Sequence, residues 1–99
     1  MSNNFFPLTV DELVKRINKI PKVKLAMLPT ALEYLPNMSK ELEINLYVKR
    51  DDCTALAFGG NKTRHLEFIM AKAVSGNYDC ILTGAGSQSN WCRQTVAAA

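Results

Sequence analysis

The sequence has few of the residues that build metal sites or disulfide frameworks. It contains one histidine, His65, and three cysteines, which form no Cys-x-x-Cys pair. These counts exclude an ordinary cysteine and histidine zinc cluster and leave at least one cysteine without a disulfide partner. Cys80 lies in an apolar run and is expected to be a buried small side chain. Because free thiols are typical of a reducing compartment, we expect a cytoplasmic protein.

Long apolar runs and a strong excess of one charge are also missing. No uncharged stretch approaches the roughly 18 residues of a membrane-spanning helix, and the first residues lack the basic and apolar regions of a signal peptide. Twelve basic and nine acidic side chains give a net charge of +3, and the basic residues form no stripe with interleaved aromatic residues. We therefore expect neither a membrane nor a nucleic acid as a partner.

The first part of the chain predicts a helix followed by an irregular segment. Residues 9–20 are predicted to be helical, because Thr9 and Glu12 match a capping box and apolar residues recur at helical spacing. Pro21 is expected to end this helix. Two further prolines within residues 22–38 indicate a mainly extended or turning segment.

The remainder of the chain predicts an α/β arrangement. Residues 44–48 alternate as a strand does, and residues 55–60 are expected to form a loop. From Lys62 onward, apolar residues recur on one helical face. A short apolar run at residues 80–82 is typical of a strand buried on both sides, and a further helix is expected to open near Arg93. Helices and strands that alternate in this way indicate an α/β fold.

Two glycine-containing motifs carry most of the functional information. Residues 59–64 read Gly-Gly-Asn-Lys-Thr-Arg and place Lys62 between a glycine turn and a helix start. Residues 84–90 read Gly-Ala-Gly-Ser-Gln-Ser-Asn and follow the apolar run at 80–82. Backbone N–H groups at a helix start favour a carboxylate or a phosphate, so the pair predicts two walls of a site for an anionic cofactor. Taken singly, each has a plainer interpretation, a surface lysine and an ordinary strand-to-helix turn.

The second motif differs from the known nucleotide-binding loops. Its two glycines resemble a dinucleotide fingerprint, but Ser89 stands where the third glycine is required. No Gly-Lys-Ser or Gly-Lys-Thr triplet follows, as a P-loop requires. A nucleotide-binding module is therefore disfavoured.

The charged residues beside these motifs have structural alternatives. Arg93 is placed to neutralise an anion near a helix start, although a surface ion pair is the more common use of such an arginine. Asp51 and Asp52 are adjacent in an extended stretch, so their side chains point to opposite faces and do not form a matched acid and base. We interpret both carboxylates as structural.

Four ordered stretches together resemble one enzyme family. Residues 57–68 are similar to the cofactor-lysine segment of the D-cysteine desulfhydrase and 1-aminocyclopropane-1-carboxylate deaminase family, which belongs to the tryptophan synthase β-type pyridoxal-phosphate enzymes. Residues 88–95 match its second signature, and residues 29–36 and 47–52 match two further stretches in the same order. The resemblance covers nearly the whole chain from about Leu25 onward.

The resemblance implies a role for several residues of the two motifs. Lys62 would form a Schiff base with pyridoxal 5'-phosphate and later handle the α-proton of the substrate. Asn61 would lie beside the cofactor, and Asn90 would donate a hydrogen bond to the oxygen on the cofactor ring. Ser89, with the backbone N–H groups of the turn at residues 89–91, would bind the substrate carboxylate and share in proton transfer.

Two positions depart from the family pattern. The family usually has lysine at position 65, where it binds the cofactor phosphate, and this chain has His65. A histidine also donates to phosphate but generally loses its charge near pH 6.5, so cofactor affinity is expected to weaken from pH 5.5 to 8. Trp91 stands where histidine or glutamine is common, and its bulk would narrow the substrate pocket or pack beneath the sheet.

The resemblance also implies a larger architecture. A strand buried on both sides needs neighbours at both edges, and this sequence has few candidates, so we interpret the chain as the N-terminal part of a longer protein. The implied fold is α/β, with two domains and a mostly parallel sheet. Residues 1–62 would belong to the larger, cofactor-binding domain and residues 63–99 would begin the smaller one. The glycine-rich phosphate cup of the family would lie further along, and its members usually form homodimers.

The expected activity follows from the same resemblance. The substrate would be a small amino acid, and the first candidate reaction is β-elimination from D-cysteine to pyruvate, sulfide and ammonia. Ring-opening deamination of 1-aminocyclopropane-1-carboxylate is the alternative within the family. An alternative of another class is a catalytically inactive piece that binds another subunit through an exposed sheet edge. The 99 residues by themselves are expected to be inactive.

Overall fold

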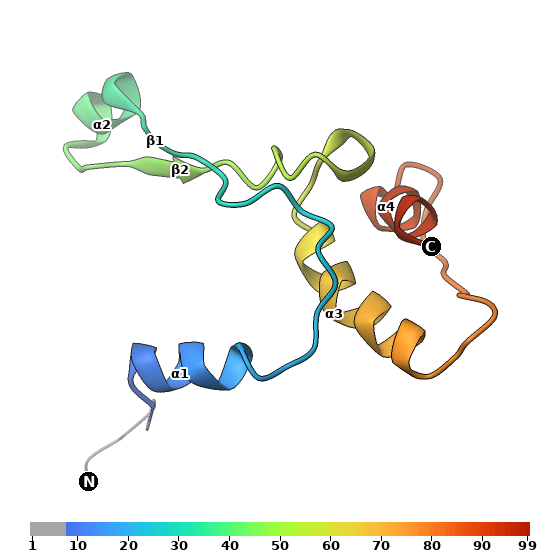
Figure 1. Ribbon diagram of the computed structural model, residues 1–99. Helices are drawn as coiled ribbons and strands as arrows, with labels where there is room; N and C mark the ends of the chain where they lie inside the picture. The colour runs from blue at the N-terminus through green and yellow to red at the C-terminus, as the bar shows by residue number, and fades with distance from the viewer. Residues whose placement is uncertain (1–7) are drawn as a thin grey trace, which may run out of the picture.

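The computed structural model describes residues 8–99, and within them the chain is open rather than compact. Its radius of gyration is 17.6 Å, against about 13 Å for a compact domain of 100 residues. Figure 1 shows α1 apart from the other elements, with the small sheet at one end and α3 and α4 at the other. In chain order the elements are α1 (Val10–Ile17), β1 (Leu32–Tyr34), α2 (Pro36–Leu42), β2 (Tyr47–Lys49), the 3-10 turn η1 (Leu56–Phe58), α3 (Thr63–Ser75) and α4 (Asn90–Ala98).

Helix α1 begins where the capping box predicts. The Thr9 hydroxyl accepts from the Glu12 N–H at 3.3 Å, and the Thr9 N–H donates to Glu12 Oε2 at 2.8 Å. The helix ends at Ile17, earlier than predicted, because the N–H groups of Lys19 and Ile20 turn back to carbonyls only three residues earlier. None of the α1 residues is buried.

The sheet consists of β1 and β2, which pair antiparallel with Leu32 opposite Lys49 and Tyr34 opposite Tyr47. The strand predicted at residues 44–48 is therefore shorter than expected, beginning three residues later and ending one residue later. The rings of Tyr34 and Tyr47 lie 5.2 Å apart, a separation at which tilted aromatic pairs attract one another. The sheet that these residues form is antiparallel, so the mostly parallel two-domain sheet, like the domain boundary after residue 62, stays a prediction.

Helix α2 is absent from the sequence prediction, in which Pro36 indicates an extended or turning segment. Proline is well accommodated in the first turn of a helix, where its missing N–H has no helical acceptor to lose, and Pro36 occupies that turn. The buried Ser39 hydroxyl accepts from the Leu46 N–H at 2.9 Å and so joins α2 to the chain that enters β2.

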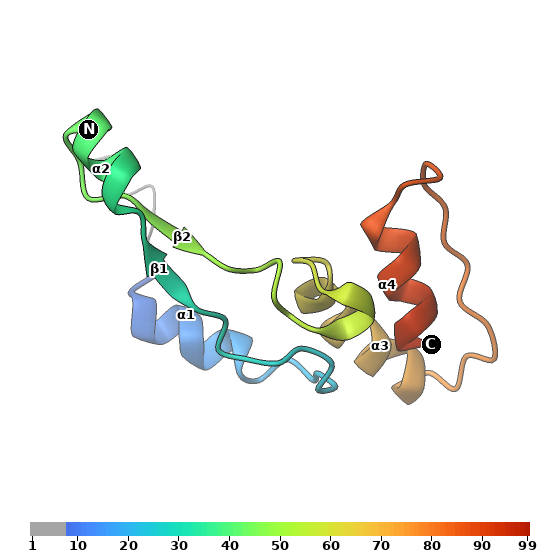
Figure 2. The same cartoon turned by 90° about the horizontal axis from the view of Figure 1, so that it is seen from above.

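The main buried region lies where α3 and α4 pack together with η1, seen from above in Figure 2. The apolar face predicted for α3 is confirmed at Leu66 and Met70, which are buried, whereas Ile69 is exposed. Much of the remaining buried surface in the described chain is polar, including Thr54, Thr63 and Gln94. Hydrogen bonds, rather than a large apolar core, therefore fix the relation of these elements.

The strand predicted at residues 80–82 is wrong. This segment has no regular secondary structure and pairs with no strand of the described chain. Cys80, expected to be buried, is exposed, and Leu82 is 94% exposed. A short apolar run becomes a strand only when neighbouring strands accept and donate its hydrogen bonds, and residues 8–99 place none beside it.

Two expectations about membranes concern different parts of the chain. No helix in the described residues is long and apolar enough to cross a bilayer. Residues 1–7, where we expected no signal peptide, lie outside the described residues.

Candidate functional site

The loop before Lys62 is built on two glycines that no other residue replaces without strain. Gly59 has a φ of +78°, and a Cβ there would lie 1.9 Å from the carbonyl oxygen of Asp52. Gly60 has a φ of +132°, and its Cβ would lie 2.4 Å from Nε2 of Gln94. Positive φ and close approach together require glycine at both positions. The loop therefore places Lys62 at the N-cap of α3, directly before its first residue Thr63, along a tightly determined path.

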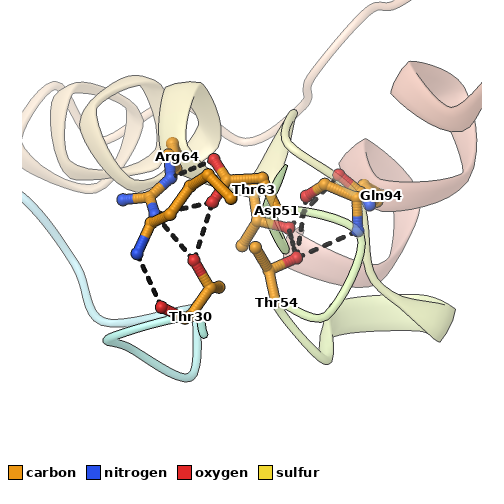
Figure 3. Close-up of polar contacts among 8 residues, drawn as sticks. Thr30, Asp51, Thr54, Thr63, Arg64 and Gln94 are labelled. Carbon is orange, nitrogen blue, oxygen red and sulfur yellow. Dashed lines mark hydrogen bonds and ion pairs between the residues drawn. The ribbon is translucent and has the colours of Figure 1, made fainter. Parts of the chain in front are cut away.

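The hydroxyl of Thr54 binds both backbone groups of Gly60. It accepts from the Gly60 N–H at 3.0 Å and donates to the Gly60 carbonyl at 2.7 Å. The hydroxyl of Thr63 donates to Oε1 of Gln94 at 3.2 Å and lies 3.1 Å from the Thr54 oxygen (Figure 3). Each hydroxyl has one proton, so with these two donations made, the contact between the threonines carries no further proton. The loop is thus closed by buried, neutral hydrogen bonds.

Helix α4 begins at the end of the second motif, with Asn90 as its first residue. Ser89 is the N-cap, and its Oγ accepts from the Cys92 N–H at 3.4 Å. The backbone N–H groups of Asn90 and Trp91 have no acceptor among residues 8–99, as is usual for the first turn of a helix. These donors, together with the positive end of the helix dipole, favour an anionic group at this position.

Arg93 connects the two motifs. Its guanidinium donates through Nη1 to the Ala57 carbonyl, and through Nη2 to the Gly59 carbonyl at 3.2 Å and to Oδ1 of Asn90 at 2.8 Å. It also lies 5.9 Å from the centre of the Phe58 ring. Arg93 thus bonds backbone carbonyls of the lysine loop and forms no ion pair within residues 8–99, while its role toward an anion stays a prediction.

Gln94 is a functional candidate that sequence reasoning missed. It is fully buried, and its Nε2 donates to the Gly59 carbonyl while its Oε1 accepts from Thr63. Its partners lie more than thirty positions away along the chain. In the sequence, only its position within residues 88–95, the second family signature, indicates a functional role for Gln94.

The predicted site residues fall into two groups. Lys62, Ser89 and Trp91 are half-buried, whereas Asn90 is exposed at the start of α4, which contacts α3 and η1. Nζ of Lys62 makes no hydrogen bond or ion pair within the described chain. The structure therefore brings the helix that carries Lys62 and the helix capped by Ser89 into direct contact.

Asn61, His65 and the glycines of the second motif are less engaged. Asn61 and His65 are exposed. A Cβ on Gly84 or Gly86 would meet nothing within 4 Å. In residues 8–99 the turn around these two glycines is therefore open, and the site is defined by the lysine loop and the start of α4.

Asp51 and Asp52 lie in a turn after β2 rather than in the extended stretch that was expected, and they have separate ion-pair partners, in agreement with the structural interpretation. Arg64 donates to Oδ2 of Asp51 from Nε at 2.6 Å and to Oδ1 from Nη2 at 2.9 Å. These bonds, with one from Thr30, lower the pKa of Asp51 to about 2. Asp52 accepts from Arg50, which lowers the pKa of Asp52 to about 2 as well. Both carboxylates are therefore charged near neutrality and do not exchange protons with each other.

The free groups of the site fit part of a pyridoxal phosphate molecule. The Lys62 amine suits its aldehyde. Oδ1 of Asn90 is occupied by Arg93, so the amide nitrogen of Asn90 is the end left to donate to the ring oxygen. The first backbone N–H groups of α4 suit a carboxylate. For the cofactor phosphate, His65 is the one predicted ligand among the described residues. Residues 8–99 contain no cluster of His, Cys, Asp and Glu side chains that could bind a metal ion.

The chain also matches known proteins. The family description "Pyridoxal-phosphate dependent enzyme" matches residues 23–99. D-cysteine desulfhydrase of Salmonella paratyphi C (strain RKS4594) is 47% identical over 83 residues, which are 84% of this chain and 25% of that protein. D-cysteine desulfhydrase of Klebsiella pneumoniae is 44% identical over 86 residues, which are 87% of this chain and 26% of that protein.

A solved structure has the same fold over the same part. The crystal structure of an ACC deaminase homologue superposes with a TM-score of 0.75 at 39% identity, over 80% of this chain and 24% of that one. The chain thus spans about a quarter of the length of these relatives. By the family match, and in agreement with the two motifs that the structure brings together, the chain belongs to the pyridoxal-phosphate dependent enzymes.

Proposed function

We propose that this chain supplies the cofactor lysine and the substrate-binding helix start of a lyase that acts on a small amino acid. The observation that carries the proposal is the direct connection between the two motifs, in which Arg93 bonds both the Gly59 carbonyl and Oδ1 of Asn90. This connection supports the assignment of Lys62 and Asn90 to one site. The names of the relatives favour β-elimination from D-cysteine, which consumes water and releases pyruvate, sulfide and ammonia.

In this proposal the cofactor, when bound, provides the electron sink for the bond that breaks at the substrate α-carbon. Lys62 would hold the cofactor through its amine, and as a free amine it would accept the α-proton of the substrate. Asn90 donates from its amide nitrogen to the ring oxygen, and its contact with Arg93 prevents the amide from turning over. Because Oγ of Ser89 accepts from Cys92, its own proton is free to bind the substrate carboxylate.

Three further residues complete the proposed site. Asn61 lies beside Lys62 and would contact the cofactor. His65, three positions after Lys62 on α3, would donate to the phosphate when protonated. Trp91 is half-buried at the start of α4, where its indole would narrow the space for the substrate side chain.

The cellular setting is part of the same proposal. The cysteines Cys53, Cys80 and Cys92 are free thiols, which favours a reducing cytoplasm. Many large apolar side chains are exposed in residues 8–99, among them Val10, Leu32 and Tyr47. Further protein surface that covers them, such as a longer chain or a homodimer partner, is consistent with this exposure.

The first experiment is a labelling map of the chain. The protein is incubated with pyridoxal phosphate and reduced with borohydride, and the labelled lysines are located by peptide mass. We expect the label to concentrate on Lys62 among the eight lysines. Lys72, exposed in the last turn of α3, is the internal reference for a surface amine. Label spread over all eight lysines according to their exposure would contradict the proposed cofactor site.

A second experiment separates the candidate reactions. A longer protein that contains this chain is assayed with D-cysteine and with 1-aminocyclopropane-1-carboxylate, which the name of the solved relative supports as the alternative. Sulfide and ammonia in equal amounts from D-cysteine support β-elimination. Ammonia from the cyclopropane substrate alone supports the deaminase. A protein that labels at Lys62 but turns over neither would favour the inactive interaction piece.

A further inference from the structure

We propose that Gln94 is a positioning residue, which fixes the lysine loop against α4 and so sets where the Lys62 amine stands relative to Asn90. This inference rests on the proposed role of Lys62. Gln94 touches neither the proposed cofactor nor the substrate, and acts through the backbone of the loop. Figure 3 shows it on α4, facing Thr54 and Thr63.

Gln94 binds the chain on both sides of Lys62. Its Nε2 donates to the Gly59 carbonyl, three positions before the lysine, and its Oε1 accepts at 3.2 Å from Thr63, the next residue after it. The side chain is fully buried, so water does not replace either bond. An amide with both ends used in this way determines the loop position and the start of α3 together.

The same helix face carries the proposed cofactor contact. Gln94 follows Asn90 by four positions, which places both on one side of α4. Arg93 adds a parallel connection, because its Nη2 binds the Gly59 carbonyl at 3.2 Å and Oδ1 of Asn90 at 2.8 Å. The carbonyl of Gly59 therefore accepts from two consecutive residues of α4, Arg93 and Gln94. Each of these bonds holds the lysine loop at its distance from the helix that carries Asn90.

The loop has little freedom to respond in another way. Both backbone groups of Gly60 are bound by Thr54, and the position of a Cβ on Gly60 is taken by the Gln94 amide. Loss of the Gln94 amide would leave the loop with only the Arg93 bonds on the side that faces α4, while Thr54 still binds the opposite side. The expected result is a loop that moves locally, within helices that remain formed.

The plainer explanation is that Gln94 only fills space between α4 and the loop. Gln94→Met distinguishes the two, because methionine has a similar length and volume and cannot make either hydrogen bond. Gln88→Met is the matched control, since Gln88 is exposed in the turn before α4. Amide hydrogen exchange and the labelling map are measured on the native protein and on both variants.

In Gln94→Met we expect amide exchange within residues 59–63 to become roughly tenfold faster, as the loss of one or two hydrogen bonds implies. Exchange in the later turns of α3 should stay at the native rate. The share of the label on Lys62 should fall toward that of Lys72. Gln88→Met should match the native protein in both measurements.

Native exchange in residues 59–63 of Gln94→Met would overturn the proposal and leave Gln94 as packing. If exchange instead rises equally in every helix, Thr63→Ser and Thr63→Val decide the question. The serine variant keeps the hydroxyl that donates to Gln94, so amide exchange in its loop should stay at the native rate. Equal exchange in the serine and valine variants would overturn the proposal. An unselective label on the native protein contradicts the proposed function, while the exchange rates still test the role of Gln94.

Discussion

Arg64 and Asp51 form a two-point ion pair that joins the first turn of α3 to the chain just after β2. Nε and Nη2 of Arg64 donate to the two carboxylate oxygens at 2.6 Å and 2.9 Å, and the hydroxyl of Thr30 donates to Oδ1 at 2.8 Å. Three segments distant in sequence meet at one carboxylate (Figure 3). Because Arg64 follows Lys62 by two positions, the pair secures the start of α3 on the side away from α4.

The ion pair predicts a pH dependence. The pKa of Asp51 is lowered to about 2, chiefly by its hydrogen bonds from Arg64 and Thr30. A lowered carboxyl pKa contributes stability above the unfolded value of about 3.9, and this contribution is lost as the pH falls toward the folded value. In Arg64→Met we expect the titration midpoint of Asp51 to rise toward 3.9, although Thr30 keeps part of the shift. The side-chain carboxyl carbon shift, followed by NMR between pH 1.5 and 6, measures the midpoint.

Arg50→Met is the matched control for this titration. Arg50 pairs with Glu33 and Asp52 rather than with Asp51. Its loss should raise the pKa of Asp52, which now lies at about 2, and leave that of Asp51 in place. Equal shifts of both carboxyl groups in either variant would show that the two pairs are not separate.

Thr54 provides a second prediction, on the free energy of unfolding. Its buried hydroxyl bonds both backbone groups of Gly60. Thr54→Val keeps the shape and leaves a buried N–H without a partner, which costs about 1–3 kcal/mol. Thr54→Ser keeps the hydroxyl and should lose less. Urea unfolding of the two variants gives the comparison, and a valine variant as stable as the serine one would contradict the role of the hydroxyl.

Glu67 provides a third prediction, on the segment that runs beside α3. This glutamate is 5% exposed, and its Oε1 accepts from the N–H groups of Leu25 and Ala26, both at 3.0 Å. Glu67→Met leaves both N–H groups without that acceptor, whereas Glu67→Gln keeps a carbonyl oxygen in place. We expect the amides of Leu25 and Ala26 to exchange faster in the methionine variant, by roughly tenfold or more, and close to the native rate in the glutamine variant.

Similar exchange in the two Glu67 variants would show that the charge, and not the acceptor geometry, secures the segment. The amide of Val23 is an internal control, because it donates at 2.9 Å to the backbone carbonyl of Glu67, which both variants keep.

Local signals in the sequence predicted local structure well. The capping box of Thr9 and Glu12 is confirmed, and α3 begins directly after Lys62, because both depend on residues a few positions apart. The strand at residues 80–82 failed for the opposite reason, since its hydrogen bonds depend on partners that no local pattern encodes. Gln94 was missed for the same reason, because its hydrogen-bond partners lie more than thirty positions away along the chain.

The two glycines of the lysine loop, in contrast, were read correctly from sequence as a turn and give the last prediction. A Cβ at Gly59 would lie 1.9 Å from the Asp52 carbonyl oxygen, and its φ of +78° is unfavourable for any other residue. The backbone strain alone costs about 1–3 kcal/mol, and the overlap with a backbone oxygen adds to it because neither atom belongs to a flexible side chain. Gly59→Ala should therefore lower the free energy of unfolding by more than this strain.

Gly84→Ala is the control for this substitution, because a Cβ there meets nothing within 4 Å and no positive φ is required. Alanine restricts the unfolded chain more than glycine does, so this variant should be neutral or more stable by about 0.4–1 kcal/mol. Urea unfolding of both variants against the native protein makes the comparison. Equal stabilities would mean that the lysine loop relaxes to admit a side chain, and then the close approach of the loop to Asp52 would not be what positions Lys62.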